Sequence, residues 1–193
     1  MKERHKIILD EFYQNAKGVF DRIGDNTLQD IVSLILDAEQ IYVLGIGHSG
    51  MFGRILSMKL NHVGLKAFTI FDEINPPFTK NDLLIAISQS GGTATVVTLA
   101  EKAKKLGGRV LGVTSNENSA LGRISDELLK IDRHADDVSF EGLAPIGDKK
   151  NQNLLGVLFG FNIYILFYTL VIELAKKREE TPDSINVRHA NLQ

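Results

Sequence analysis

The sequence predicts an α/β protein with a parallel sheet that is covered by helices on both faces. Short apolar runs of strand length alternate with longer segments in which apolar residues recur at helical spacing. This alternation is typical of βαβ units, whose strands are buried on both sides. Two expected strands lead directly into turns rich in glycine and hydroxyl side chains, at residues 45–50 and 88–93. We call these turns the first corner and the second corner.

The elements follow one another in a regular order. Two amphipathic helices are expected at 4–22 and 28–38, separated by a Gly-Asp-Asn-Thr break that can cap the second. Apolar runs predict five strands, at 41–44, 67–71, 83–87, 109–114 and 127–131. Helices are expected between these strands, at 51–63, 94–106 and 119–124. We expect residues 132–153 to form a polar loop.

A long apolar stretch raises the question of a membrane. Residues 154–174 are almost wholly apolar and long enough to span a bilayer, within a helix expected to end near Lys177. We interpret this helix as a core helix that its own domain covers on one side and a second subunit covers on the other. A Thr-Pro-Asp-Ser turn at 181–184 then caps a last short helix at 185–189.

Length and composition describe an ordinary globular protein. The chain has 193 residues, of which 44% are hydrophobic and 24% charged, which fits a single domain over 1–193. We divide it into N-terminal helices (4–38), an α/β core (40–177) and a tail helix (182–193). A net charge of −2 predicts neither nucleic acid nor membrane as a partner. There is no cysteine and no apolar leader, so we expect a cytoplasmic protein without disulfides or thiolate chemistry.

The second corner predicts a phosphate site. Ser88-Gln-Ser-Gly-Gly-Thr93 stands between a buried strand and a helix. A helix start at this place offers free N–H groups and the positive end of the helix dipole. Ser88, Ser90 and Thr93 add donors without filling the space. The structural alternative is an ordinary Ser/Thr helix cap.

The first corner leaves three interpretations open. Gly45-Ile-Gly-His-Ser-Gly50 matches the dinucleotide fingerprint, and Asp72-Glu73 closes the next strand where that fold has its ribose-binding acid. Alternatively, the glycines only permit a tight turn. We favour a sugar phosphate, because it needs one polar corner for the phosphate and another for the sugar. The expected contacts then come from Gly47, His48 and Ser49, although His48 could equally be a solvated loop residue.

Three other basic residues are candidates for either a surface role or a functional role. Arg54 and Lys59 follow the first corner on a helix, and we expect both at the surface, with Arg54 in an ion pair. His189 stands near the end of the chain, where an idle histidine is common. Its place in the expected short helix, with Leu192 as an anchor, makes it a candidate functional residue.

These features resemble the sugar isomerase (SIS) domain family, and within it the 6-phospho-3-hexuloisomerase branch. The resemblance covers nearly the whole chain in order. It rests on the two corners, on Glu73-Ile-Asn-Pro-Pro77, on Pro145-Ile-Gly147 and on Arg188-His-Ala-Asn-Leu192. The last motif points to the hexuloisomerase branch, whereas arabinose-5-phosphate isomerases differ there.

The resemblance implies a three-layer αβα sandwich with a five-stranded parallel sheet. It implies interconversion of a 3-hexulose 6-phosphate and fructose 6-phosphate through an enediol, without metal or cofactor. Ser49, Ser88, Ser90 and Thr93 would hold the phosphorylated sugar. It also implies a homotetramer, or a homodimer, in which His189 reaches a neighbouring subunit's site and assists ring opening or moves a proton.

The chain departs from the family pattern at three positions. His48 replaces an arginine, and Gly92 replaces a glutamate or arginine. Asn151 stands where the family has its catalytic glutamate, and an amide cannot take a proton from carbon. Glu73 or Asp148 could supply the carboxylate, and we name Glu141 as the substitute base. The alternatives are another phosphosugar isomerase, such as the arabinose-5-phosphate type, and a phosphosugar-binding protein without turnover.

Overall fold

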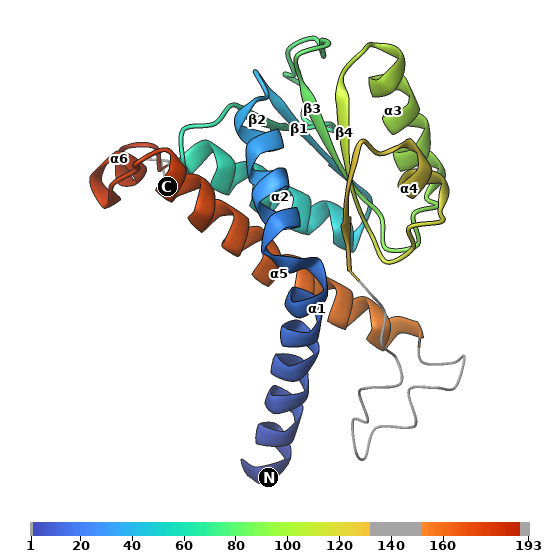
Figure 1. The fold of residues 1–193 in the computed structure, drawn as a ribbon, viewed down its shortest axis with the longest axis vertical. Coiled ribbons are helices and arrows are strands. Elements are labelled where there is room, and N and C mark those ends of the chain that lie inside the picture. The colour runs from blue at the N-terminus through green and yellow to red at the C-terminus, as the bar shows by residue number, and fades with distance from the viewer. Residues whose placement is uncertain (1, 132–151, 190–193) are drawn as a thin grey trace.

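The computed structural model, which describes residues 2–131 and 152–189, contains a five-stranded parallel sheet in the order β2-β1-β3-β4-β5. The expected α/β fold is therefore confirmed (Figure 1). The strands are β1 (Ile41–Gly45), β2 (Ala67–Thr69), β3 (Leu83–Ile87), β4 (Arg109–Thr114) and β5 (Glu127–Lys130).

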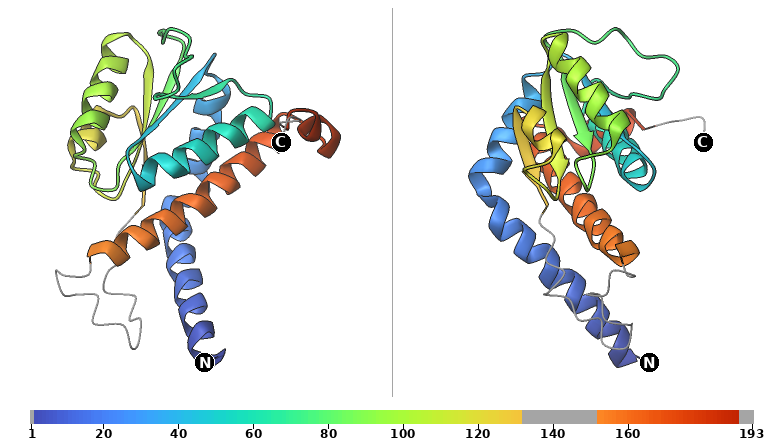
Figure 2. Two further views of the ribbon diagram at one scale, coloured as in Figure 1. Left: turned by 180° about the vertical axis from the view of Figure 1, so that it is seen from behind. Right: turned by 90° about the vertical axis from the view of Figure 1, so that its right-hand side faces the viewer.

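Helices cover both faces of the sheet, as the alternating pattern predicts. Figure 2 shows α3 and α4 on one side and α1, α2 and α5 on the other, while the N-terminal half of α1 extends away from the sheet. The helices are α1 (Lys2–Leu36), α2 (His48–His62), α3 (Ala94–Lys105), α4 (Ala120–Ile124), α5 (Gln152–Lys177) and α6 (Pro182–Val187).

The two core layers follow from the pleat of the strands. Val43 and Ile85 are register partners and pack with α1, α2 and α5 in one hydrophobic cluster. Their neighbours Tyr42 and Leu84 pack with α3 in the other cluster. Every residue of β1 and β3 is buried, which explains why both strands read as unbroken apolar runs.

The break that the sequence predicts between the two N-terminal helices is present, because Gly24 takes the non-helical φ 73° and ψ 156° and kinks α1 there. The end of one strand differs from the sequence expectation. Strand β2 ends at Thr69 instead of Phe71. Beyond Thr69, the Asn75 amide donates to the carbonyls of Thr69, Ile70 and Asp72, so a side chain takes over the backbone hydrogen bonding there.

Helix α5 is the long apolar helix, and it lies between α1 and α2. Phe161 of α5 meets Phe12 of α1 edge to face with ring centroids 4.9 Å apart, and Asn162 donates to Asn15 Oδ1 over 2.8 Å. Residues 156–177 are long and apolar enough to cross a membrane, and half of the most apolar window is buried inside the protein. Tyr164 and Ile172 remain 42% and 53% exposed on the outer side of α5.

Candidate phosphosugar site

The two corners leave adjacent strands at the same edge of the sheet. Gly45, the last residue of β1, is the register partner of Ile87, the last residue of β3. The strand order reverses between these two strands, because β1 connects to β2 on one side and β3 begins on the other. In open α/β sheets, ligands bind in the crevice at such a reversal point. The corners therefore adjoin, as the sequence predicted for a single pocket.

Hydrogen bonds fix the shape of the second corner. The Ser88 hydroxyl lies 2.9 Å from Thr93 Oγ1 and accepts from the Gly91 amide over 3.1 Å. Ser88 is buried, whereas Ser90 is exposed and its oxygen accepts from the Gly92 amide. A hydroxyl that accepts through its oxygen can still donate its proton. Ser90 therefore offers a donor at the surface of a rigid corner.

Gly91 is required by the backbone and by close packing. Its φ of +65° lies in the region that favours glycine. A Cβ at this position would lie 1.9 Å from Ser119 Oγ, whereas a Cβ at Gly92 would meet nothing closer than 3.9 Å. The Gly91 carbonyl also accepts from the Leu121 amide. The neighbouring element α4 thus holds the second corner in place.

Both helices that start at the corners lack a side-chain cap. Thr93 is the N-cap of α3, but its hydroxyl faces Ser88 and makes no capping bond. Gly47, the N-cap of α2, has no side chain to offer. The first-turn N–H groups and the positive dipole ends of two helices are thus left for an anion. This result favours the phosphate interpretation over an ordinary Ser/Thr cap.

The first corner is tighter than the sequence suggested. Helix α2 begins at His48 and not at residue 51, so His48 and Ser49 lie in its first turn. A Cβ at Gly45 would lie 2.7 Å from the Ser49 carbonyl carbon, and a Cβ at Gly50 would lie 2.7 Å from the Gly45 carbonyl oxygen. These two glycines therefore serve the close approach of strand and helix.

His48 lies against α5. Its ring meets Phe52 edge to face at 4.8 Å, and a Cβ at Gly160 would lie 2.6 Å from His48 Cε1. Glycine at position 160 is what lets the exposed His48 ring lie there. His48 thus belongs to the side of the first corner that faces α5.

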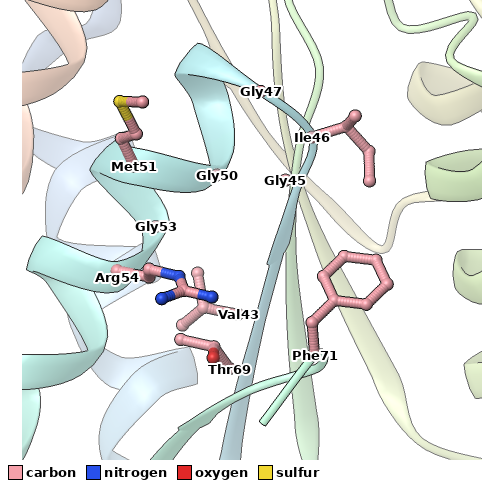
Figure 3. A pocket seen from close by; sticks show the side chains of 10 residues that line it. All are labelled: Val43, Gly45, Ile46, Gly47, Gly50, Met51, Gly53, Arg54, Thr69 and Phe71. Carbon is pink, nitrogen blue, oxygen red and sulfur yellow. The ribbon is translucent and has the colours of Figure 1, made fainter.

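A cavity of about 380 Å³ opens beside the first corner, between α2 and the ends of β1 and β2. Figure 3 shows that Arg54 extends its guanidinium to the side where Val43 and Thr69 lie. Thr69 is only 8% exposed, and its buried hydroxyl has no hydrogen-bond partner. The expected ion pair of Arg54 is not found in the described part of the chain. Sequence reasoning missed Thr69, since a threonine at the end of a strand carries no special signal.

The two candidate catalytic residues that the structure describes, Glu73 and His189, do not line the cavity. Glu73 is exposed in the segment after β2 and does not line the cavity, although Phe71 does. Glu141, Asp148 and Asn151 lie outside the described residues. His189 follows α6 and does not belong to it, which corrects the expected short helix at 185–189. Within residues 2–131 and 152–189, no group of three or more His, Asp or Glu side chains could hold a metal.

His189 is far from the corners of its own chain. It stacks on His62, the last residue of α2, with ring centroids 3.9 Å apart. The first corner lies at the other end of the same helix, which has 15 residues. At about 1.5 Å per residue, this separation is about 21 Å. His189 in this position cannot touch a ligand in its own crevice.

An open parallel sheet with two uncapped helix starts at its reversal point defines an α/β protein that binds a small phosphorylated ligand. The SIS domain family model matches residues 34–148. The chain is 30% identical to a 3-hexulose-6-phosphate isomerase of Methanocaldococcus jannaschii, over 96% of this chain and 92% of that protein. It therefore belongs to the SIS domain family.

Further relatives agree with this assignment. A 3-hexulose-6-phosphate isomerase of Bacillus subtilis is 28% identical over 96% of this chain and 95% of its own length. A crystal structure of a Methanococcus jannaschii protein, from which the same activity was inferred, superimposes with a TM-score of 0.80 at 25% identity and covers 96% of this chain and 98% of that one. The Vibrio vulnificus NanR protein complexed with ManNAc-6P gives a TM-score of 0.68 at 27% identity, over 93% of this chain and 66% of that one.

Proposed function

We propose that this protein is a phosphosugar isomerase that interconverts a 3-hexulose 6-phosphate and fructose 6-phosphate. The observation that carries the proposal is the pair of adjoining corners at the ends of β1 and β3, each of which opens an uncapped helix. The relatives that match over nearly the whole chain bear the name of this activity.

The phosphate belongs at the second corner. Ser90 offers an exposed hydroxyl, and the start of α3 offers free amides and the positive end of a helix of 12 residues. Ser88 and Thr93 hold the corner in shape through their mutual contact. Three or four donors converging on one group are what a phosphate dianion requires.

The sugar extends from the second corner toward the first corner and the cavity beside it. Gly47 and Ser49 approach it from the first corner. Arg54, which lines the cavity, provides donors for sugar oxygens. A cavity of about 380 Å³ is large enough for a six-carbon chain.

The reaction moves a carbonyl from C3 to C2. A base removes the proton on C2 while a donor protonates the oxygen on C3, which gives an enediol. The enediol then loses the proton of its C2 hydroxyl and gains a proton on C3. Glu73 and Glu141 are the candidate bases, and His189 moves protons at the sugar oxygens or assists ring opening.

His189 serves the site of a neighbouring subunit. Its separation of about 21 Å from its own first corner supports this assignment, since α2 lies between the two. The outer face of α2 and α5 supports an assembly as well, because Met51, Met58, Tyr164 and Ile172 are 42–65% exposed there. We propose a cytoplasmic homotetramer, or homodimer, in which this face is covered and the long helix is not a membrane span.

A turnover assay tests the proposal. Purified protein without added metal should convert 3-hexulose 6-phosphate to fructose 6-phosphate, which a coupled dehydrogenase reaction detects. His189→Ala should abolish conversion but keep the protein folded. Failure to convert any of a panel of five- to seven-carbon sugar phosphates contradicts the proposal.

The second candidate is a protein that binds a phosphosugar and does not turn it over. Asn151 in place of the family's glutamate favours it, and so does the NanR protein that was solved with ManNAc-6P. This candidate predicts that a sugar phosphate raises the melting temperature without formation of a product.

A further inference from the structure

His62 is a buried histidine to which the proposed reaction gives no role. It is the last residue of α2 and is 9% exposed. Its ring is stacked on that of His189, with centroids 3.9 Å apart and planes inclined by 27°. A buried aromatic ring therefore lies under the one histidine that we place in the neighbour's site.

The chain around this stack is anchored at several points. Arg188 donates to the His62 carbonyl over 3.1 Å and to Glu180 Oε2 over 2.7 Å. Arg178 donates through Nε to the Val63 carbonyl over 2.7 Å. Both arginines thus satisfy carbonyls at the C-terminal end of α2, where cations are favoured. The backbone that carries His189 is fixed to the end of α2 rather than left free.

His62 is held as a neutral ring. Burial, followed by the charges of His189 and Lys59, lowers the pKa of His62 from its ordinary value of 6.5. Its Nδ1 is buried and has no hydrogen-bond partner. A neutral aromatic face attracts a cation, whereas an imidazolium in the same place would repel one. Lys59 and Arg188 are the other cations close to it, and Glu180 is the nearby anion.

We infer that His62 is a positioning residue, a neutral aromatic platform that holds the His189 ring in the orientation it uses at the neighbouring subunit's site. The inference rests on the proposed function, in which His189 takes part in the reaction. A neutral platform lets His189 gain and lose a proton without leaving its place. His62 itself touches no substrate.

The test compares two variants of the full-length protein that differ in the aromatic ring. His62→Phe keeps a flat neutral ring, and His62→Leu fills similar volume without one. We expect His62→Phe to keep kcat within about threefold, and His62→Leu to lower kcat at least about tenfold with KM for fructose 6-phosphate changed less than about twofold. His5→Ala, at an exposed histidine of α1, is the matched control and should leave kcat unchanged.

A second readout follows the stack itself. The ring current of the platform shifts the His189 Cε1 proton upfield in the NMR spectrum, and His189→Ala identifies the signal. The shift should persist in His62→Phe and disappear in His62→Leu, whether or not Leu also lowers the melting temperature.

The outcomes separate the inference from the proposed function. If the wild type turns over and His62→Leu keeps its kcat, the inference is overturned and the proposed function stands. The inference is also overturned if both variants lower kcat equally while the His189 signal stays in place. If the wild type converts no sugar phosphate, the proposed function falls, and the inference falls with it.

Discussion

At the scale of single residues, the site depends on hydroxyl groups whose oxygens are already used inside the protein. Ser88 and Ser90 both accept from backbone amides of the second corner, over 3.1 Å and 3.3 Å. Their oxygens are thereby fixed. Of the two, only Ser90 is exposed, so Ser90 is the serine that we expect to touch phosphate.

Ser90→Ala should weaken the binding of inorganic phosphate about tenfold, because a hydrogen bond to a charged group contributes about 1.5 kcal/mol. Isothermal titration calorimetry measures this change. Ser33→Ala, at an exposed serine of α1 that bonds its own helix, is the control. Equal phosphate affinity in wild type and Ser90→Ala would place the phosphate elsewhere.

The lowered pKa of His62 predicts a pH dependence of stability. Above the ordinary value of 6.5, His62 is neutral in both the folded and the unfolded chain and has no effect. As the pH falls below that value, the unfolded chain takes up the proton first, so the folded state loses stability. We expect His62→Phe to lose less melting temperature than the wild type between about pH 7.5 and about pH 5.5. A larger loss in the variant would contradict this sign.

At the scale of elements, the boundaries that the sequence could predict are those set by local chemistry. The apolar runs predict β1 and β3, and the serine and glycine residues that follow β3 predict the second corner. The sequence also predicts the cap at residues 181–184, where Thr181 forms a capping box with Ser184. The early end of β2 was missed, because it depends on what the Asn75 side chain reaches across the turn.

The second corner should depend on Gly91 and tolerate a change at Gly92. Gly91→Ala forces a Cβ into Ser119 at a φ of +65°, so we expect a loss of about 1–3 kcal/mol and a melting temperature about 3–10 °C lower. Phosphate affinity should fall with it. Gly92→Ala is the matched control, with no atom closer than 3.9 Å to the added Cβ. Identical melting curves for the two variants would exclude this account of the corner.

At the scale of the whole molecule, the sequence predicts the adjoining corners but not the contact that His189 makes within its own chain. The sequence predicted that the two corners adjoin, and the register of Gly45 with Ile87 agrees. That they share one pocket stays a prediction, because the cavity beside the first corner is lined by none of residues 88–93. The importance of His62 could not be predicted, because a lone histidine before Gly64 gains meaning only from its contact with His189. The same contact separates His189 from its own crevice and points to a neighbouring subunit.

The exposed apolar face of α2 and α5 should be an interface between subunits. Ile172→Glu, at a side chain that is 53% exposed on α5, should produce a smaller particle by size-exclusion chromatography with light scattering. Activity should fall in parallel, because His189 would have no neighbour to serve. Leu106→Glu, at a side chain that is 48% exposed beyond α3, is the control on the opposite layer. An unchanged mass for Ile172→Glu would contradict the assignment of this face.

The central claim is that the two corners hold a phosphosugar whose enediol joins C2 and C3. Incubation of fructose 6-phosphate with the protein in D₂O, followed by proton NMR, tests it most directly. We expect the 3-hexulose 6-phosphate that forms to carry deuterium on C2, and the reverse reaction to replace the C3 proton of fructose 6-phosphate with deuterium. Ser90→Ala should slow this exchange. Exchange on C1 instead, or a C3 proton that stays in place with no new product, would contradict the claim.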